Sequence, residues 1–288
     1  MTIELDVRLQ DGRTLHAYDT RSGPSVADGE APESATAVFW LHGSPNLGSP
    51  PEPLFAAAAA HGLRWISYDR PGYGGPSPHD GRAVASAASD VAAIADALGI
   101  ERFAVLGHSG GGPHALACAA LLAERVIAAV SIAAPAPFAA EGLDWFAGWS
   151  PGIAAENRAA TSGRAALRAH WAQTEPEDMS AFFTEADVAA LGGDWSWLAG
   201  VTGKAIEQGN EGMLEDTLAA VQPWGFHPGN IDVPVLVMHG GNDRMVPTDH
   251  GRWLAARCPT AALRLIPEAG HITVLDGAPD ALAWIGTV

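Results

Sequence analysis

The sequence predicts an α/β fold, with a mostly parallel eight-stranded sheet flanked by helices and a helical cap inserted between two strands. Short apolar runs typical of buried strands alternate with alanine-rich stretches whose apolar residues recur at helical spacing. The alternation stops after Pro137 and resumes near residue 226. We therefore expect one core domain made of residues 1–136 and 226–288, with residues 137–225 as the inserted cap.

The first two strands are expected to form a hairpin. Ile3–Leu9 and Thr14–Tyr18 alternate apolar and polar residues, and the Asp11-Gly12 pair between them favours a tight turn. The next strand, TAVFWL over 36–41, is almost wholly apolar, as in a strand buried on both faces. A helix over 51–62 follows, with proline near its start and glycine after its end.

The rest of the core continues the same alternation. Apolar runs predict five further strands, and each one is followed by a helical pattern or a glycine-rich turn. The expected strands are LRWISY at 63–68, RFAVLG at 102–107, VIAAVSIAAP at 126–135, VPVLVMHGG at 233–241 and ALRLIPEAG at 262–270. The expected helices are 86–99, 111–124, 248–258 and one beginning at Asp280.

The inserted segment contains helix-like pieces, no convincing strand, and six of the ten tryptophans in the chain. Aromatic side chains in a cap suit a hydrophobic substrate, although they can equally form the core of the cap itself. The candidate pocket residues are Trp145, Trp149, Trp171, Trp195 and Trp197.

Charge and composition exclude several classes of partner. The net charge is −17, with Lys204 as the single lysine, and such a surface repels nucleic-acid phosphates and anionic lipid headgroups. No apolar run is long enough for a membrane helix, and the N-terminus lacks the basic and apolar regions of a signal peptide. We expect a cytoplasmic protein with no nucleic-acid or membrane partner. No oligomeric state is predicted.

Metal and cofactor motifs are missing from the sequence. Cys118 and Cys258 are the only cysteines, and neither their number nor their spacing suits a disulfide framework or a metal site. There is no H-E-x-x-H motif. We therefore expect no metal and no cofactor.

The glycine cluster GHSGGG at 107–112 has three interpretations. A dinucleotide-binding loop would need the motif G-x-G-x-x-A, followed about twenty positions later by an acidic residue. The motif is present, but a proline interrupts it, and no obvious acidic residue ends a strand at that distance. As a plain tight turn, its serine would be incidental. As a nucleophile elbow, G-x-S-x-G places Ser109 between a strand and a helix, with Gly107 and Gly111 making room for the bend.

An elbow serine needs a base and an acid that orients the base. Asp243 follows the strand at 233–241, and His271 follows the strand at 262–270. The chain order of serine, aspartate and histidine is the order expected for such an elbow. Asp232 and Asp276 are competing acids, but neither directly follows a strand. The sequence therefore favours a triad of Ser109, Asp243 and His271.

Five short motifs resemble the α/β-hydrolase fold family, and within it the cap-bearing serine hydrolases related to carboxylesterases. They are LHGSP, SYDRPGYGGPS, GHSGGG, HGGNDRMVP and EAGH, spread from residue 41 to 271. By this resemblance, the backbone N–H groups of Ser44 and Gly110 would form an oxyanion hole, with His42 and Gly43 supporting the turn.

The resemblance implies hydrolysis of carboxylic esters of small to medium apolar acyl groups through an acyl-enzyme, with a small-molecule ester as substrate. Lactones, carbon–carbon bonds and prolyl peptides are alternatives on the same triad, and perhydrolysis is a possible side activity. A small-ligand receptor of the same fold with little turnover is an alternative of another class. Haloalkane and epoxide chemistry use an aspartate at the elbow, so Ser109 argues against both.

Overall fold

The computed structural model describes residues 2–21, 35–75, 77–175, 177–207 and 209–288. Its centre is an eight-stranded sheet in the order β1-β2-β4-β3-β5-β6-β7-β8. The hairpin strands β1 (Ile3–Arg8) and β2 (Thr14–Asp19) pair antiparallel, and β2 joins the sheet antiparallel to β4 (Leu63–Tyr68). All the remaining pairs are parallel. The predicted fold class and hairpin are confirmed.

The parallel strands are β4, β3 (Thr36–Leu41), β5 (Phe103–His108), β6 (Val126–Ile132), β7 (Val235–Gly240) and β8 (Ala261–Ile266). Strands β3, β5 and β7 are buried almost throughout, because helices cover both faces of the sheet. A strand covered on both faces needs apolar residues at successive positions, which explains the apolar runs from which these strands were predicted.

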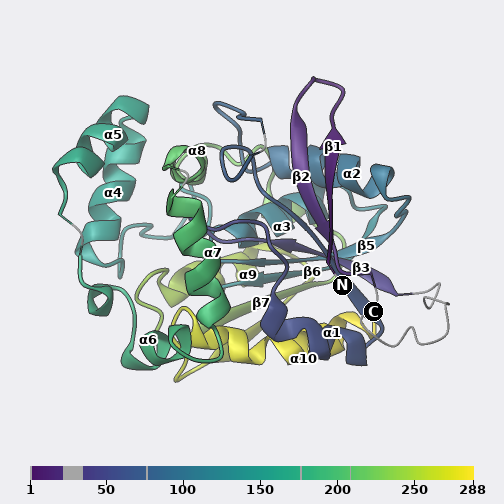
Figure 1. Cartoon of the computed structure of the whole chain (residues 1–288). Coiled ribbons are helices and arrows are strands. Elements are labelled where there is room, and N and C mark those ends of the chain that lie inside the picture. The colour runs from purple at the N-terminus through teal and green to yellow at the C-terminus, as the bar shows by residue number, and fades with distance from the viewer. Residues whose placement is uncertain (1, 22–34, 76, 176, 208) are drawn as a thin grey trace.

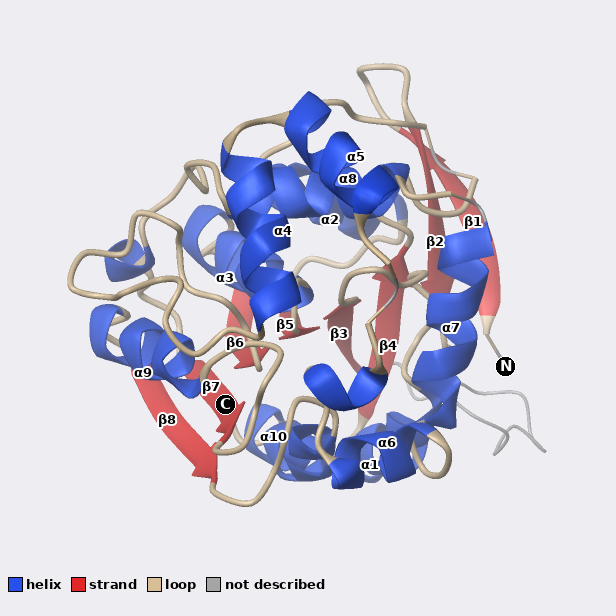
Figure 2. Cartoon of the chain, turned by 90° about the vertical axis from the view of Figure 1, so that its left-hand side faces the viewer, coloured by secondary structure: helices blue, strands red, loops and turns tan. Residues whose placement is uncertain are grey.

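Two helical layers enclose the sheet (Figure 2). One face carries α2 (Ser86–Ala97), α3 (Gly111–Leu121) and α9 (Thr248–Arg257), whose apolar residues join one core cluster. The opposite face carries α1 (Phe55–Ala60) and α10 (Ala278–Ile285) in a second cluster. Short 3-10 turns precede α1 (Glu52–Leu54) and α10 (Thr273–Gly277).

Between β6 and β7 the described residues form helices and loops only. The helices are α4 (Pro151–Thr161), α5 (Arg164–Gln173), α6 (Glu185–Leu191), α7 (Ser196–Glu207) and α8 (Glu211–Ala220). Figure 1 shows α4 and α5 beyond one end of the strands, at the left. We refer to residues 137–225 as the helical segment. Among the described residues, no helix is long and apolar enough to cross a membrane.

Strand register brings four loops together at this end of the sheet. Leu41 at the end of β3 pairs with Gly107 near the end of β5, so the loops that follow these strands emerge side by side. Gly240 at the end of β7 pairs with Ile266 at the end of β8, so the next two loops also emerge together. In open α/β sheets, sites form at the carboxyl ends of the strands, which is where these four loops meet.

Candidate active site

Ser109 occupies a strained turn between β5 and α3. Its φ is 53°, a left-handed conformation that is uncommon for a residue with a side chain, and its N–H donates to the Ile132 carbonyl at 2.8 Å. A Cβ on Gly107 would overlap the Gly111 carbonyl, and a Cβ on Gly111 would overlap the Leu41 carbonyl. The two glycines are therefore required by the close approach of β3, β5 and α3 around the serine.

Asp243 and His271 are in direct contact. The Nδ1 atom of His271 lies 2.8 Å from Oδ2 of Asp243, and both side chains are buried. The other carboxylate oxygen, Oδ1, accepts from the N–H groups of Met245 at 2.9 Å and Val246 at 2.8 Å. Burial acts to raise the pKa of Asp243, but His271 and His239 outweigh it and hold this pKa well below its usual range. Asp243 is therefore an ionised partner that fixes the imidazole.

His108 connects the histidine loop to the elbow. Its Nε2 donates to the His271 carbonyl at 3.0 Å, and the two rings lie 4.9 Å apart between centroids. Because His108 directly precedes Ser109, this contact places the His271 loop beside the serine. Burial lowers the pKa of His108 to about 3, so its ring is neutral at physiological pH. The structure thus joins Asp243 to His271 and, through His108, links the His271 loop to the turn that carries Ser109.

The Ser44 loop lies against the start of α3. An ideal Cβ on Gly110 would lie 3.6 Å from the Ser44 nitrogen, and one on Gly43 would lie 3.4 Å from Cβ of Ser109. His42 supports this turn through both ring nitrogens: Nδ1 donates to the Gly43 carbonyl at 2.8 Å, and Nε2 accepts from the Arg70 N–H at 3.1 Å. His42 is therefore neutral, and burial together with the nearby Arg70 holds its pKa well below the usual range.

Arg70 and Asp216 form a buried cluster behind the Ser44 loop. The sequence predicts that Arg70 organises the turn beneath the site, whereas Asp216 is missing from our predictions. The Arg70 guanidinium donates to the carbonyls of His42 and Gly43 and to the Ser44 hydroxyl. Its Nη2 lies 2.6 Å from Oδ2 of Asp216. The cluster therefore ties the Ser44 loop to α8 of the helical segment.

Asp216 is saturated with donors. Its carboxylate is also bonded by Arg82, by the Tyr73 hydroxyl at 2.7 Å, and by the Ser44 hydroxyl. Burial acts to raise the pKa of Asp216, but Arg70 and Arg82 hold it well below its usual range. No local signal in the sequence marks this residue as part of the site. In the structure, Met213, Asp216, Thr217 and Ala220 share one face of α8, and all four line the cavity described next.

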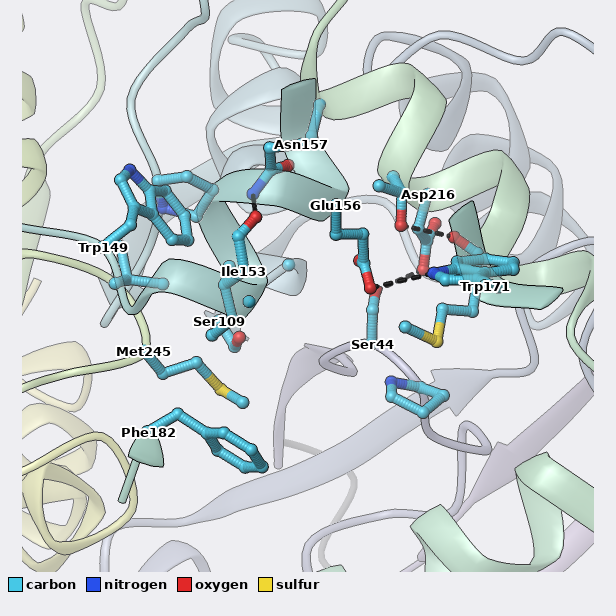
Figure 3. Close-up of a pocket in the computed structure, with 18 of the residues that line it drawn as sticks. Ser44, Ser109, Trp149, Ile153, Glu156, Asn157, Trp171, Phe182, Asp216 and Met245 are labelled. Carbon is cyan, nitrogen blue, oxygen red and sulfur yellow. Dashed lines mark hydrogen bonds between the residues drawn. The ribbon is translucent and has the colours of Figure 1, made fainter. Parts of the chain in front are cut away.

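A cavity of about 420 Å³ lies between the strand ends and the helical segment. The core side of the cavity is lined by Ser44, Ser109 and Gly110. The other side is lined by residues of the helical segment, which include Ile153 and Glu156. Figure 3 shows Ile153 of the helical segment and Met245 of the core near Ser109, with Glu156 and Trp171 of the helical segment on the side of Ser44. Trp171 Nε1 donates to Glu156 at 2.9 Å, and burial raises the pKa of this carboxyl.

The structure places the five candidate tryptophans in different surroundings. Trp149 and Trp171 line the cavity. Trp145 stacks on Trp149 at 5.0 Å between centroids and belongs to the core of the helical segment. Trp195 donates to Asp276 at 2.8 Å, and Trp197 packs edge-on against Trp40 at 6.2 Å. The expectation that Trp145, Trp195 and Trp197 line the pocket is therefore corrected, because these three rings fill the packing within and beneath the helical segment.

The described residues contain no cluster of three or more histidine, cysteine or acidic side chains that could hold a metal ion. Cys118 and Cys258 are both buried and unbonded to each other. What the site offers is a hydroxyl on a strained turn, an imidazole held by an ionised carboxylate, and backbone N–H groups at a helix start. These groups suit nucleophilic attack on a carbonyl with stabilisation of the resulting oxyanion.

Comparison with known proteins gives a consistent picture. A family model described as the alpha/beta hydrolase fold matches residues 36–278. A non-heme chloroperoxidase of Streptomyces lividans is 31% identical over 267 residues, which cover 88% of this chain and 93% of that protein. A 2-hydroxy-6-oxononadienedioate/2-hydroxy-6-oxononatrienedioate hydrolase of Cupriavidus pinatubonensis is 27% identical, with 92% of this chain and 88% of that protein covered.

Solved structures match over the whole chain. A thermophilic esterase from Thermogutta terrifontis superposes with a TM-score of 0.69 at 19% identity, covering 100% of this chain and 98% of that one. The enol-lactonase from Burkholderia xenovorans LB400 has a TM-score of 0.66 at 22% identity, covering 99% and 100%. At these identities the likeness establishes the fold.

Proposed function

Because the chain belongs to the alpha/beta hydrolase fold family, we propose that it is a serine hydrolase that cleaves carboxylic esters of small to medium, uncharged acyl groups. The observation that carries the proposal is the position of Ser109 in the wall of a cavity of about 420 Å³, next in sequence to His108. His108 donates to the backbone carbonyl of His271, and the ring of His271 is hydrogen-bonded in turn to Asp243. The esterase and enol-lactonase among the structural neighbours have the same fold.

In the proposed mechanism, His271 removes the proton of the Ser109 hydroxyl while Oγ attacks the ester carbonyl. The carbonyl π electrons move to oxygen, and the N–H groups of Ser44 and Gly110 stabilise that oxyanion. Asp243 holds the imidazole in the required tautomer and stabilises the imidazolium. When the oxyanion collapses, the alkoxide leaves and takes its proton from His271, and the acyl group stays on Ser109. His271 then activates a water that releases the acid.

We propose that the helical segment is the cap of this site and decides the acyl group. It would divide the chain into a core of residues 1–136 and 226–288 and a cap of residues 137–225. Support comes from the cavity wall, to which Trp149, Ile153 and Trp171 of this segment contribute apolar surface. A cavity of 420 Å³ with apolar walls suits a small ligand that is largely buried.

The charges around the cavity favour an uncharged substrate. No lysine or arginine lines it within the part of the chain that the structure describes, whereas Glu156, Glu175, Glu177 and Asp216 do. An acyl group ending in a carboxylate would meet the like charges of the glutamates, and the Arg70 and Arg82 cations behind the cavity are already paired with Asp216. This lining argues against a dienedioate substrate of the kind named for the Cupriavidus pinatubonensis relative.

Turnover of a p-nitrophenyl ester series from acetate to octanoate tests the proposal, together with labelling by a fluorophosphonate. We expect rapid labelling and a maximum of kcat/KM at short or medium chains. Ser109→Ala should lower kcat by about 10⁶-fold without changing the fold. Ser89→Ala, which alters an exposed serine of α2, is the matched control and should keep full activity. Tight binding of esters by the wild-type protein without turnover would instead support a receptor.

A further inference from the structure

Asp187 of α6 makes an unusual set of contacts with the loop that carries His271. Its side chain is fully buried and accepts five hydrogen bonds. Oδ2 accepts from the N–H groups of Thr184 and His271, each at 3.1 Å. Oδ1 accepts from the N–H groups of Ile272 at 2.9 Å and Thr273 at 2.8 Å, and from the Thr273 hydroxyl at 2.9 Å.

Only one of these bonds belongs to ordinary helix capping. Thr184 and Asp187 form a capping box at the start of α6, and this accounts for the bond to the Thr184 N–H. The other four bonds come from the N–H groups of His271, Ile272 and Thr273 and from the Thr273 hydroxyl, at the start of the 3-10 turn Thr273–Gly277. N–H groups at the start of a helical turn lack partners within the turn, and here a carboxylate from the helical segment supplies them.

The histidine loop is adapted to this carboxylate. A Cβ on Gly270 would overlap the carboxylate of Asp187, so glycine is the residue that lets the aspartate reach the backbone. Gly270 in turn donates to the Thr273 hydroxyl at 2.8 Å, the same hydroxyl that donates to Asp187. Burial acts to raise the pKa of Asp187, but the bonds from Thr273 and Thr184 outweigh it and lower this pKa, so the group is ionised at neutral pH.

His271 is thereby held at three points. Asp243 fixes its ring, His108 donates to its carbonyl, and Asp187 accepts from its N–H. We propose that Asp187 is a positioning residue for the reaction, through which the helical segment holds the backbone of His271 in the geometry that proton transfer from Ser109 needs. This inference rests on the proposed serine-hydrolase function and assigns α6 a task separate from shaping the cavity.

The test compares Asp187→Asn with Thr184→Ala in the full-length protein. The asparagine keeps the shape but puts an NH₂ group against backbone donors, so kcat should fall by about 100-fold, as expected for a misplacement of about 1 Å, while KM changes by less than about twofold. The rate of fluorophosphonate labelling should fall in parallel. Thr184→Ala removes the hydroxyl that accepts from the Asp187 N–H and leaves the contacts to the histidine loop intact. It should lower thermal stability and leave kcat unchanged.

A spectroscopic readout separates positioning from general loosening. The low-field proton resonance of the hydrogen bond between His271 and Asp243 should shift or broaden in Asp187→Asn and stay in place in Thr184→Ala. If Asp187→Asn does not fold, Thr273→Val replaces it. This variant loses the hydroxyl that donates to Asp187 and accepts from the Gly270 N–H, and kcat should fall by roughly threefold to tenfold or more, since one hydrogen bond is worth about that factor.

The failure of each claim can be recognised separately. If the wild-type protein neither hydrolyses esters nor reacts with the fluorophosphonate, the proposed function is wrong. If the wild-type protein does both, the inference about Asp187 is overturned by wild-type kcat in Asp187→Asn, by wild-type kcat in Thr273→Val, or by an equal loss of kcat in Thr184→Ala.

Discussion

Arg70 and Asp216 form a buried ion pair behind the Ser44 loop, with Nη2 and Oδ2 2.6 Å apart across 146 residues of sequence. The same guanidinium donates to the carbonyls of His42 and Gly43. Arginine suits this position because its planar fork can hold a carboxylate and two carbonyls at once. The pair therefore links the helical segment to the loop that we propose stabilises the oxyanion.

Arg70→Lys should lower kcat by about 100-fold, because a single ammonium cannot hold both the Ser44 loop and Asp216, and a lost oxyanion donor costs a factor of this size. KM should change little. Arg125→Lys is the matched control, since Arg125 donates to the carbonyls of Ile100 at 2.6 Å and Glu101 at 3.1 Å near the opposite end of the sheet. Steady-state kinetics on a p-nitrophenyl ester measure both variants. Wild-type kcat in Arg70→Lys would rule out this role.

Gly111→Ala should destabilise the protein by about 3 kcal/mol or more, because the new methyl group overlaps the carbonyls of Leu41 and His42, which are backbone atoms. Gly200→Ala is the control within helix α7, where a Cβ has no neighbour within 4 Å. That change should be neutral or stabilise by up to about 1 kcal/mol. Urea denaturation gives both free energies of unfolding. Equal stability of the two variants would contradict the packing that we describe around the elbow.

Stability should fall in mild acid because several histidines are buried in the neutral form. Burial lowers the pKa of His108 and His114 to about 3 and that of His250 to about 4. The unfolded chain has ordinary histidine pKa values near 6.5. Below that pH the unfolded state binds protons that the folded state does not. The contribution of each histidine to the free energy of unfolding is therefore complete above about pH 6.5, and it declines by about 1.4 kcal/mol per pH unit toward pH 4.

Denaturant unfolding at pH 7, 6 and 5 measures this slope, and His250→Asn provides the comparison. The asparagine oxygen can replace Nδ1 of His250 as the acceptor for the Ala136 N–H, which lies 3.0 Å away. The slope of the free energy of unfolding against pH should decrease in this variant by about 1.4 kcal/mol per pH unit, which corresponds to one proton fewer taken up on unfolding. An unchanged slope would show that His250 is not buried in its neutral form.

Wild-type protein should prefer a neutral acyl chain to one of the same length that ends in a carboxylate, by at least about tenfold in kcat/KM. Glu156→Gln should narrow this gap severalfold, because it removes the carboxylate that points into the cavity beside Trp171 (Figure 3). The comparison is best made at pH 8 rather than in mild acid, because burial raises the pKa of Glu156 and ionisation of this carboxyl increases with pH. Glu124→Gln, which alters an exposed residue outside the cavity, should leave the preference unchanged.

Sequence patterns predicted the strands well because strand burial leaves a local pattern of apolar residues, whereas the triad of Ser109, Asp243 and His271 stays a prediction. Burial on both faces requires an unbroken apolar strand, and β3, β5 and β7 show it directly. The aromatic residues were predicted less well. A tryptophan on a helix looks the same in sequence whether it lines a cavity, as Trp171 does, or packs beneath the segment, as Trp197 does.

The sequence by itself determined the elbow at Ser109 and the turns that carry Asp243 and His271, because a strained bend needs glycine at fixed positions and each of the groups that we propose as catalytic follows its own strand. Only the tertiary structure decided which carboxylates support them. Asp187 and Asp216 read as ordinary surface residues of helices, yet both are buried against backbone or arginine partners that lie 84 and 146 residues away. Hydrogen bonds over such separations leave no local pattern, because folding alone brings the partners together.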